Sequence, residues 1–322
     1  MKKIVKAREF SSFLFLIALF AIVGIINPAF LSADNIIACF NESVVYIIIS
    51  AGMAFAIFIG EIDVSVGANL GFVATVVSSM LRDGQNWAVA FITGIVIGAL
   101  IGLFNGWGVA VMGVPSLIFT LGTNGVMRGM MYVYTGGVWV ENLPPAFSHM
   151  YTATLVGSLS ICFAVTAVCI IIIHLILKHT KRGKYFIAVG DNPSGATLVG
   201  IPALQTKIAA YVICGICAAI AGIVFSSRIG FVTATSGNGY EMKAVAACVL
   251  GGISLSGGVG SVIGSSVGAI IMASISRLLV FMGFGSTYDN AITGIMLIVI
   301  VVADALMQRR SAEMNRRQRL AA

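Results

Sequence analysis

Polar side chains placed inside apolar stretches are where this sequence carries chemistry. One set lies in Gly-Glu-Ile-Asp-Val-Ser, between two apolar runs, and another lies within residues 115–134. Ionisable and polar groups are costly inside a membrane and commonly mark the route of a solute or ion. The sequence therefore predicts a candidate translocation path. Its residues are Glu61, Asp63, Ser65, Thr120, Thr123, Asn124 and Arg128.

Each of these residues also has a purely structural interpretation. Asp63 can cap the helix that starts beside it, with Ser65 in support, because carboxylates accept hydrogen bonds from free N–H groups at helix starts. Arg128 can pair with Glu61, with Asp63 or with backbone carbonyls and so only brace the helices. The residue types leave capping and solute contact both open.

Signatures of bond-breaking chemistry are missing from the sequence. It has no G-x4-G-K-[ST] phosphate loop, no Ser/His/Asp set and no cluster of metal ligands. The six cysteines lie mostly in apolar runs, where packing is their usual role. We therefore expect no catalytic residue, no cofactor and no metal, and a chain that is not itself an enzyme.

The elements that must position the polar residues are membrane helices. Of the 322 residues, 59% are hydrophobic and 10% charged, whereas soluble domains are roughly a quarter charged. One crossing needs about 20 apolar residues. We predict an all-α polytopic membrane protein, with residues 1–322 forming a single transmembrane domain that includes short or broken helices. The ten expected spans are residues 10–26, 44–59, 64–81, 88–112, 115–134, 153–177, 208–226, 244–255, 261–282 and 291–306.

The basic residues predict how the chain is oriented. Four of the nineteen precede Phe10, five lie in residues 178–207 and five follow Met307. Lys and Arg concentrate on the cytoplasmic side of membrane proteins. Both termini and residues 178–207, here called the island, are therefore expected in the cytoplasm, with residues 308–322 as a basic tail. The net charge of +7 thus reports orientation in a lipid bilayer, and we expect no nucleic-acid partner.

The island is the one long polar stretch, and its composition predicts a short helix. Asn192 or Asp191 can cap this helix, Pro193 can occupy its first turn and Gly200 can end it. A membrane protein with so much exposed chain is expected to meet a partner there.

Glycines at spacings of four predict close helix packing within the chain, with a dimer face as the alternative. They are Gly94, Gly98, Gly102 and Gly106 in one run, and Gly260, Gly264 and Gly268 in another. Two short stretches, residues 60–67 and 251–258, also share the pattern G-x-I-[DS]-aliphatic-S-x-G. Each interrupts an apolar run, as broken helices in transporters do.

Four blocks of the sequence resemble one family, in order along most of the chain. They are GEIDVSVGANLGF from Gly60, GVPSLIFTLGTNGVMRGMMYVYTGG from Gly113, GKYFIAVGDNPSGATLVGI from Gly183 and GNGYEMKAVAACVLGGISLSGGVGSVIG from Gly237. The family is the ribose-type permeases of bacterial ABC importers, which carry ribose, xylose, galactose, arabinose or a sugar-like quorum signal. The chain departs from it at Glu61, where members usually have glycine.

The resemblance implies a permease of the bacterial inner membrane that imports a small sugar or sugar-like solute. It implies a second permease subunit, in a homodimer or heterodimer, two cytoplasmic ATPase subunits or one tandem ATPase, and a solute-binding protein outside. Residues 178–207 would be the coupling loop. Its ATPase-coupling residues would be Gly190, Asp191, Asn192, Pro193, Ser194, Gly195, Ala196, Thr197, Leu198 and Gly200.

Other functions remain open at this point. An ion-gradient-driven secondary carrier would need titratable groups near the middle of the membrane, for which Asp63, Glu61 and Arg128 are the candidates. An ABC permease for branched-chain amino acids or nucleosides is the nearer alternative. No sequence feature favours a channel or a scaffold.

Overall fold

The computed structural model describes residues 2–283, 288–289, 291–299 and 301–302. The predicted span 291–306 lies partly outside these residues, and the predicted tail 308–322 lies wholly outside them. The α-helices are α1 (Lys2–Ile26), α2 (Ala33–Phe58), α3 (Val66–Arg82), α4 (Trp87–Ala110), α5 (Ser116–Thr135), α6 (Pro145–Thr152), α7 (Ile161–His179), α8 (Lys181–Asp191), α9 (Pro193–Leu198), α10 (Ala203–Ile229), α11 (Tyr240–Leu250) and α12 (Val262–Phe281). There is also a 3-10 helix, η1 (Pro28–Leu31), and a hairpin of β1 (Thr154–Val156) and β2 (Leu159–Ser160). Residues 288–289, 291–299 and 301–302 are helical as well.

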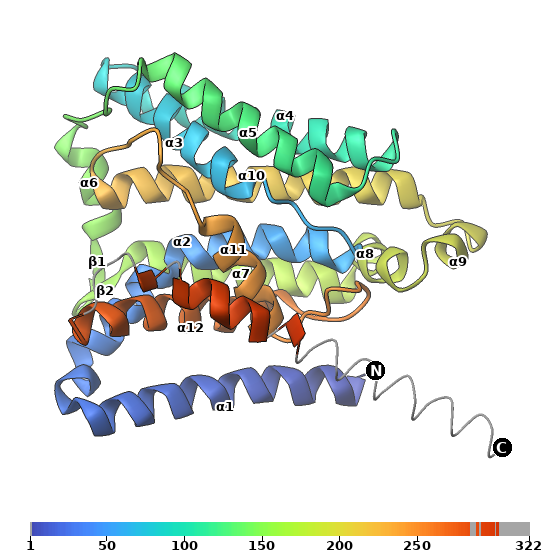
Figure 1. Cartoon of the computed structure of the whole chain (residues 1–322), viewed down its shortest axis with the longest axis horizontal. Coiled ribbons are helices and arrows are strands. Elements are labelled where there is room, and N and C mark those ends of the chain that lie inside the picture. Colours follow the sequence, from blue (N-terminus) through green and yellow to red (C-terminus); the bar gives the residue numbers. More distant parts are fainter. Residues whose placement is uncertain (1, 284–287, 290, 300, 303–322) are drawn as a thin grey trace.

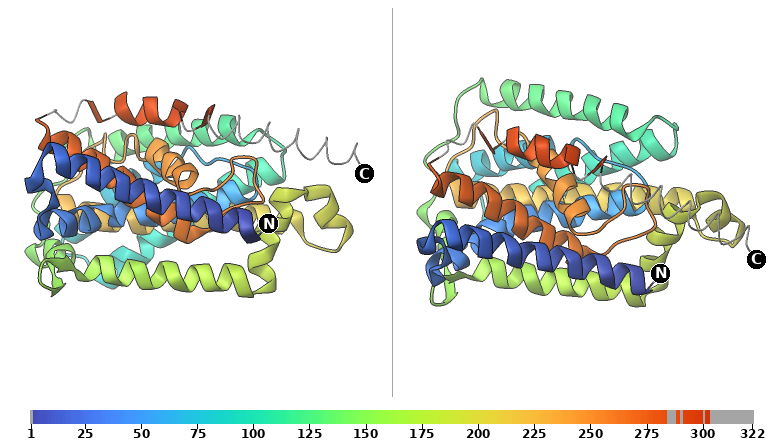
Figure 2. Two further views of the ribbon diagram at one scale, coloured as in Figure 1. Left: turned by 90° about the horizontal axis from the view of Figure 1, so that it is seen from below. Right: turned by 60° about the horizontal axis from the view of Figure 1, so that its bottom comes forward.

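The long helices run side by side along one direction (Figure 1). Helices α8 and α9 project beyond them at one end, where α1 also begins, and α6 and the β-hairpin lie at the other end. Figure 2 shows the same projection from two further sides. Helix α1 thus begins at the same end of the bundle as the island helices; the side of the membrane that this end faces stays a prediction.

Helices α2 and α10 form the centre of the bundle. Helix α10 packs along α4, α2 and α3, and α2 also packs against α12. Five helices in the described residues are long and apolar enough to cross a membrane, namely α2, α4, α7, α10 and residues 262–279 of α12. Shorter apolar helices cover residues 12–25 and 66–82. The chain is an all-α polytopic membrane protein; its exact number of crossings stays a prediction.

The glycines of α4 lie against neighbouring backbones. A β-carbon at Gly98 would lie 2.5 Å from the Gly215 carbonyl oxygen, and one at Gly102 would lie 2.3 Å from the Tyr211 carbonyl oxygen, both on α10. Gly94 faces α3, and Gly106 faces the first turns of α10. In α12, Gly264 and Gly268 lie against α11 and Gly251. These distances leave no room for side chains. Such close approach of backbones holds helices together in a membrane, because lipid supplies no hydrophobic force between them.

Several predicted boundaries are wrong, for local reasons. Helix α2 begins at Ala33, not in the forties, because Ser32 caps it and its polar first turns find partners in the fold. Helix α7 begins at Ile161 because a hairpin that turns at Gly157 (φ +57°) occupies residues 154–160. The predicted outer loop after Gly136 contains α6, and Gly260, at φ +142°, precedes α12 instead of lying on it.

The eighth predicted span is also wrong. Helix α11 covers only 11 residues, Tyr240–Leu250, which at 1.5 Å per residue is too short to cross a bilayer. It begins inside the bundle, after a loop that runs inward from the end of α10 (Figure 1). Its C-terminus is followed by Gly252 in the left-handed region, at φ +83°. Residues 251–261 then connect α11 to α12 without helix and are called the second interruption.

Candidate functional site

The first interruption, residues 59–65, is an unwound segment between α2 and α3 that runs from the island end toward the middle of the bundle (Figure 1). Unwound backbone at membrane depth needs hydrogen-bond partners from the protein or from a wet cavity. Helix α5 supplies them from residues spaced by four. Thr120 Oγ1 accepts from the Val64 N–H at 3.0 Å, and Asn124 Nδ2 donates to the Val64 carbonyl at 2.9 Å. Ser116 Oγ lies 3.4 Å from the Ile62 nitrogen, which donates to it.

Asp63 lies at the centre of the site. Its carboxylate accepts from the backbone N–H of Ser65 at 2.9 Å and from the Ser65 hydroxyl at 2.6 Å. Asn105 Nδ2 donates to Ser65 Oγ at 2.8 Å and lies 3.3 Å from Asp63 Oδ2. Thr123 in turn donates to Asn105 Oδ1 at 2.7 Å. All four side chains are buried, so this network brings α4, α5 and the first interruption together.

The geometry at Asp63 resembles a cap displaced from the helix. Helix α3 starts at Val66, and its N-cap Ser65 makes no capping bond with its own side chain. Asp63 binds the Ser65 N–H instead, and among the described residues no Lys or Arg forms an ion pair with it. A buried carboxylate held only by neutral donors depends on each of these hydrogen bonds, because buried polar groups are costly when left unpaired.

The other two charged candidates lie on either side of this network with their own partners. Glu61 forms an ion pair with Lys207 of α10, with 2.7 Å between Oε1 and Nζ. Arg128 Nη1 donates to the Ser236 carbonyl at 2.6 Å. Arg128 Nη2 and Glu241 Oε2 are buried without a hydrogen-bond partner in the described part of the chain. Five of the seven predicted path residues therefore meet, while Glu61 and Arg128 do not join them.

The island contains the predicted short helix. Asn192 Oδ1 accepts from the Gly195 N–H at 2.8 Å as the N-cap of α9, Pro193 occupies the first turn and Gly200 has φ +81°. Ala196 is buried, whereas Leu198 and Val199 are 88% and 76% exposed. The polar island therefore carries two highly exposed apolar side chains next to each other.

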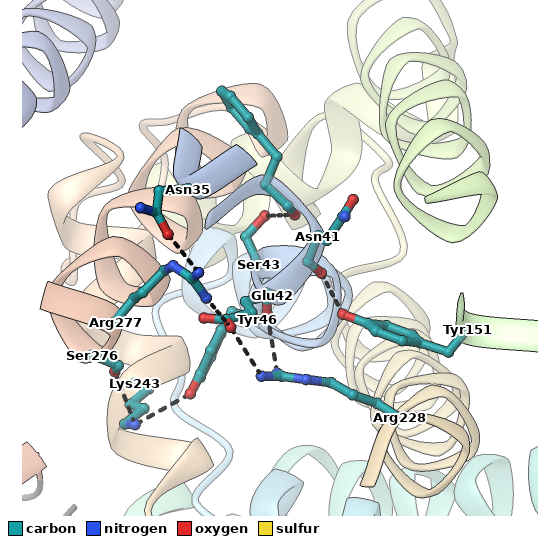
Figure 3. A network of polar contacts seen from close by, with 11 residues as sticks. Asn35, Asn41, Glu42, Ser43, Tyr46, Tyr151, Arg228, Lys243, Ser276 and Arg277 are labelled. Carbon is teal, nitrogen blue, oxygen red and sulfur yellow. Dashed lines mark hydrogen bonds and ion pairs between the residues drawn. The ribbon is translucent and has the colours of Figure 1, made fainter. Parts of the chain in front are cut away.

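A further charged network joins α2, α10 and α12 at the end of the bundle away from the island (Figure 3). Arg277 bonds Glu42 Oε1 at 2.6 Å and Asn35 Oδ1 at 2.9 Å, and Arg228 Nη2 lies 3.9 Å from the same Glu42 oxygen. Lys243 pairs with Asp289, which also accepts from Ser276, and Lys243 bonds the Tyr46 hydroxyl at 3.2 Å. This network cross-links elements far apart in sequence.

The edge of this network lies on α6. The Tyr151 hydroxyl donates to the Asn41 carbonyl at 2.6 Å. Burial raises the pKa of Tyr151 to about 12, so the phenol stays a neutral donor at physiological pH.

Sequence reasoning missed Asn105, Lys207 and the Glu42 partners. Asn105 carried a usable signal, since it is an amide inside the apolar run that holds the α4 glycines. Lys207 was counted only as an orienting charge. The partners of Glu42 were beyond reach because they lie 186 and 235 residues away along the chain.

Comparison with known proteins decides the family. The family model described as branched-chain amino acid transport system / permease component matches residues 35–301. The chain belongs to this permease family. The sequence prediction of an importer permease in the bacterial inner membrane is thereby confirmed. No solved structure matches the chain significantly.

Curated relatives align with the permease over almost its full length. The autoinducer 2 import system permease protein LsrC of Enterobacter sp. (strain 638) is 39% identical over 96% of this chain and 90% of its own. The protein of the same name from Escherichia coli O157:H7 is 36% identical over 100% and 94%, and that of Salmonella typhi is 35% identical over 100% and 92%.

Proposed function

We propose that this permease imports autoinducer 2, or a closely related sugar-like signal, as the membrane subunit of an ATP-driven importer. The observation that carries the proposal is the full-length likeness to autoinducer 2 import permeases. The family itself is described by branched-chain amino acid transport, which keeps an amino acid as the alternative cargo. The G-E-I-D-V-S-V-G and V-Y-T-G-G blocks, together with these relatives, favour the sugar-like class.

The island is proposed to bind the ATPase. It carries Lys178, Lys181, Arg182 and Lys184 at its start, which favours a cytoplasmic position. Its helix α9 stands clear of the bundle (Figure 1), and Leu198 and the C-cap Val199 are exposed. The proposed contact comprises the coupling residues named above, from Gly190 to Gly200. Two ATPase subunits or one tandem ATPase, a second permease subunit and an external binding protein complete the proposed assembly.

The solute path is proposed to pass along the first interruption. Asp63, Ser65, Thr120, Thr123 and Asn124 offer donors and acceptors that suit a polyhydroxylated solute. The free Arg128 Nη2 and Glu241 Oε2 offer further capacity beside them. Nucleotide drives transport through its different affinities for two conformations. The path itself should bind weakly, because the binding protein supplies the affinity.

Uptake in cells that lack their own permease tests the cargo. The chain is produced with its cognate binding protein and ATPase, and removal of autoinducer 2, ribose and leucine from the medium is followed. We expect ATP-dependent removal of autoinducer 2 at least tenfold faster than of the other two. Faster leucine uptake would favour the amino-acid alternative. Transport by purified permease alone, driven by an ion gradient, would overturn the ATP-driven proposal.

A charged substitution tests the island. Leu198→Glu is expected to abolish co-purification of the ATPase. Met112→Glu is the matched control, since Met112 is also exposed, 56% against 88%, and follows α4 outside the island. Retained ATPase binding in Leu198→Glu would remove the island from the contact.

A further inference from the structure

The end of α8, in the island, meets both interruptions at one point. The Gly258 N–H, from the second interruption, donates to the Phe58 carbonyl at the end of α2 at 3.0 Å. Gly190, the penultimate residue of α8, lies against both groups. The last residue of α8, Asp191, lies against Gly258. Three segments that are distant in sequence therefore share one backbone contact, here called the glycine junction (Gly60, Gly190, Gly257 and Gly258).

The glycine junction has no space for side chains. A β-carbon at Gly190 would lie 1.7 Å from the Phe58 oxygen and 2.7 Å from the Gly258 nitrogen. One at Gly257 would lie 2.8 Å from the Gly60 nitrogen and 3.1 Å from the Gly190 α-carbon. Contact between backbones passes displacement on directly, because close-packed interiors compress little and no side chain can rotate to absorb the motion.

A second tie connects the last residue of the island, Lys207, to the first interruption. Lys207 lies about one turn into α10 and pairs with Glu61, with 2.7 Å between Nζ and Oε1. Both side chains are largely buried, at 24% and 19% exposure. Removing one partner of such a pair leaves a poorly solvated charge. The island thus contacts Phe58 through Gly190 and Glu61 through Lys207.

We propose that Gly190 and the Glu61–Lys207 pair are positioning residues that pass displacement of the island to both interruptions at once. This inference rests on the proposed function, since it supposes that an ATPase moves the island. It also assigns Glu61 to coupling in place of the solute path. Both interruptions are then displaced with α8 when nucleotide binds.

Coupling efficiency in the complete reconstituted importer, containing permease, ATPase and binding protein, tests Gly190. Solute imported per ATP hydrolysed is compared for wild type, Gly190→Ala and Gly294→Ala. Gly294 lies in helical residues 291–299, and a β-carbon there meets nothing within 4 Å. We expect Gly190→Ala to hydrolyse ATP while importing at least tenfold less solute per ATP, and Gly294→Ala to match wild type. A wild-type ratio in Gly190→Ala would overturn its assignment.

Charge exchange tests the ion pair and covers the case in which Gly190→Ala does not fold. Glu61→Lys and Lys207→Glu are each expected to lower solute per ATP at least threefold, and the double variant to restore it to within twofold of wild type. A merely structural pair would alter protein yield and leave this ratio unchanged. Single variants with wild-type ratios, or a double variant without rescue, would overturn the inference. Failure of the proposed function would instead appear as no ATP-dependent import by wild type.

Discussion

The two interruptions share a sequence pattern but are stabilised by different means. The first is held by side chains from α4 and α5, including Asn105, Thr120 and Asn124, and contains a buried carboxylate. The second closes on its own backbone, where the Ser254 N–H donates to the Val259 carbonyl and the Gly257 N–H to the Ser254 carbonyl, both at 3.0 Å. Side-chain bonds can be exchanged for bonds to water or solute, whereas packed backbone turns can only move as a unit. The difference predicts that the first interruption exchanges its hydrogen-bond partners during transport, whereas the second keeps its own.

Removing the Asp63 carboxylate gives the largest expected effect. Asp63→Leu removes the acceptor of the Ser65 N–H and of the Ser65 hydroxyl, and each unpaired buried group costs about 1–3 kcal/mol. Since each 1.4 kcal/mol is a factor of ten, we expect uptake to fall about 100-fold at equal permease levels in the membrane. Asp63→Asn keeps one acceptor oxygen and should fall less. Equal uptake by Asp63→Leu and wild type would show that the first interruption needs no polar centre.

At the second interruption, added volume should matter and polarity should not. A β-carbon at Gly264 would lie 2.1 Å from the Gly251 carbonyl oxygen. Gly264→Ala and Gly264→Ser should therefore destabilise the detergent-purified permease alike, by about 1–3 kcal/mol, measured as a lower unfolding temperature. Gly125→Ala, on α5 with open space around it, is the control. A serine variant clearly more stable than the alanine variant would mean that this region accepts polar contacts as the first one does.

A smaller effect is expected from the α5 residues that hold the first interruption. Asn124→Leu leaves the Val64 carbonyl without its donor, at a cost of about 1–3 kcal/mol. We expect uptake to fall about tenfold, measured at matched expression. Leu121→Val, an apolar change on the exposed face of α5, should have little effect. Similar losses in both variants would indicate that α5 matters only for packing.

Local sequence signals predicted what local interactions determine. Asn192, Pro193 and Gly200 were sufficient to predict α9, because a cap, a first-turn proline and a left-handed stop act within a few residues. The four-residue glycine spacing predicted the α4 packing face for the same reason. The sequence does not predict the start of α2. Its first turns are polar, as in a loop, and their helical structure is supported by Arg277 of α12, which pairs with Glu42.

The site was predicted only in part. Asp63, Ser65, Thr120, Thr123 and Asn124 could be chosen as polar residues in apolar surroundings, and the structure places them together. That Glu61 bonds Lys207, and that Asn105 joins Asp63 to Thr123, depends on helix packing between segments 146 and 42 residues apart. Single-sequence patterns carry no information on such pairings. The cytoplasmic side of the island stays a prediction from its charges.

The most direct measurement compares water access at matched positions in the two interruptions. Val64 and Leu255 occupy equivalent places in the shared pattern, and both are half-buried. Val64→Cys and Leu255→Cys are each assembled into the complete importer and reacted with a water-soluble thiol reagent, with ADP or with a non-hydrolysable ATP analogue, against wild type as the blank. The account predicts that the reaction rate changes at least tenfold with nucleotide at position 64 and less than twofold at position 255. An unchanged rate at position 64, or equal changes at both positions, would contradict it.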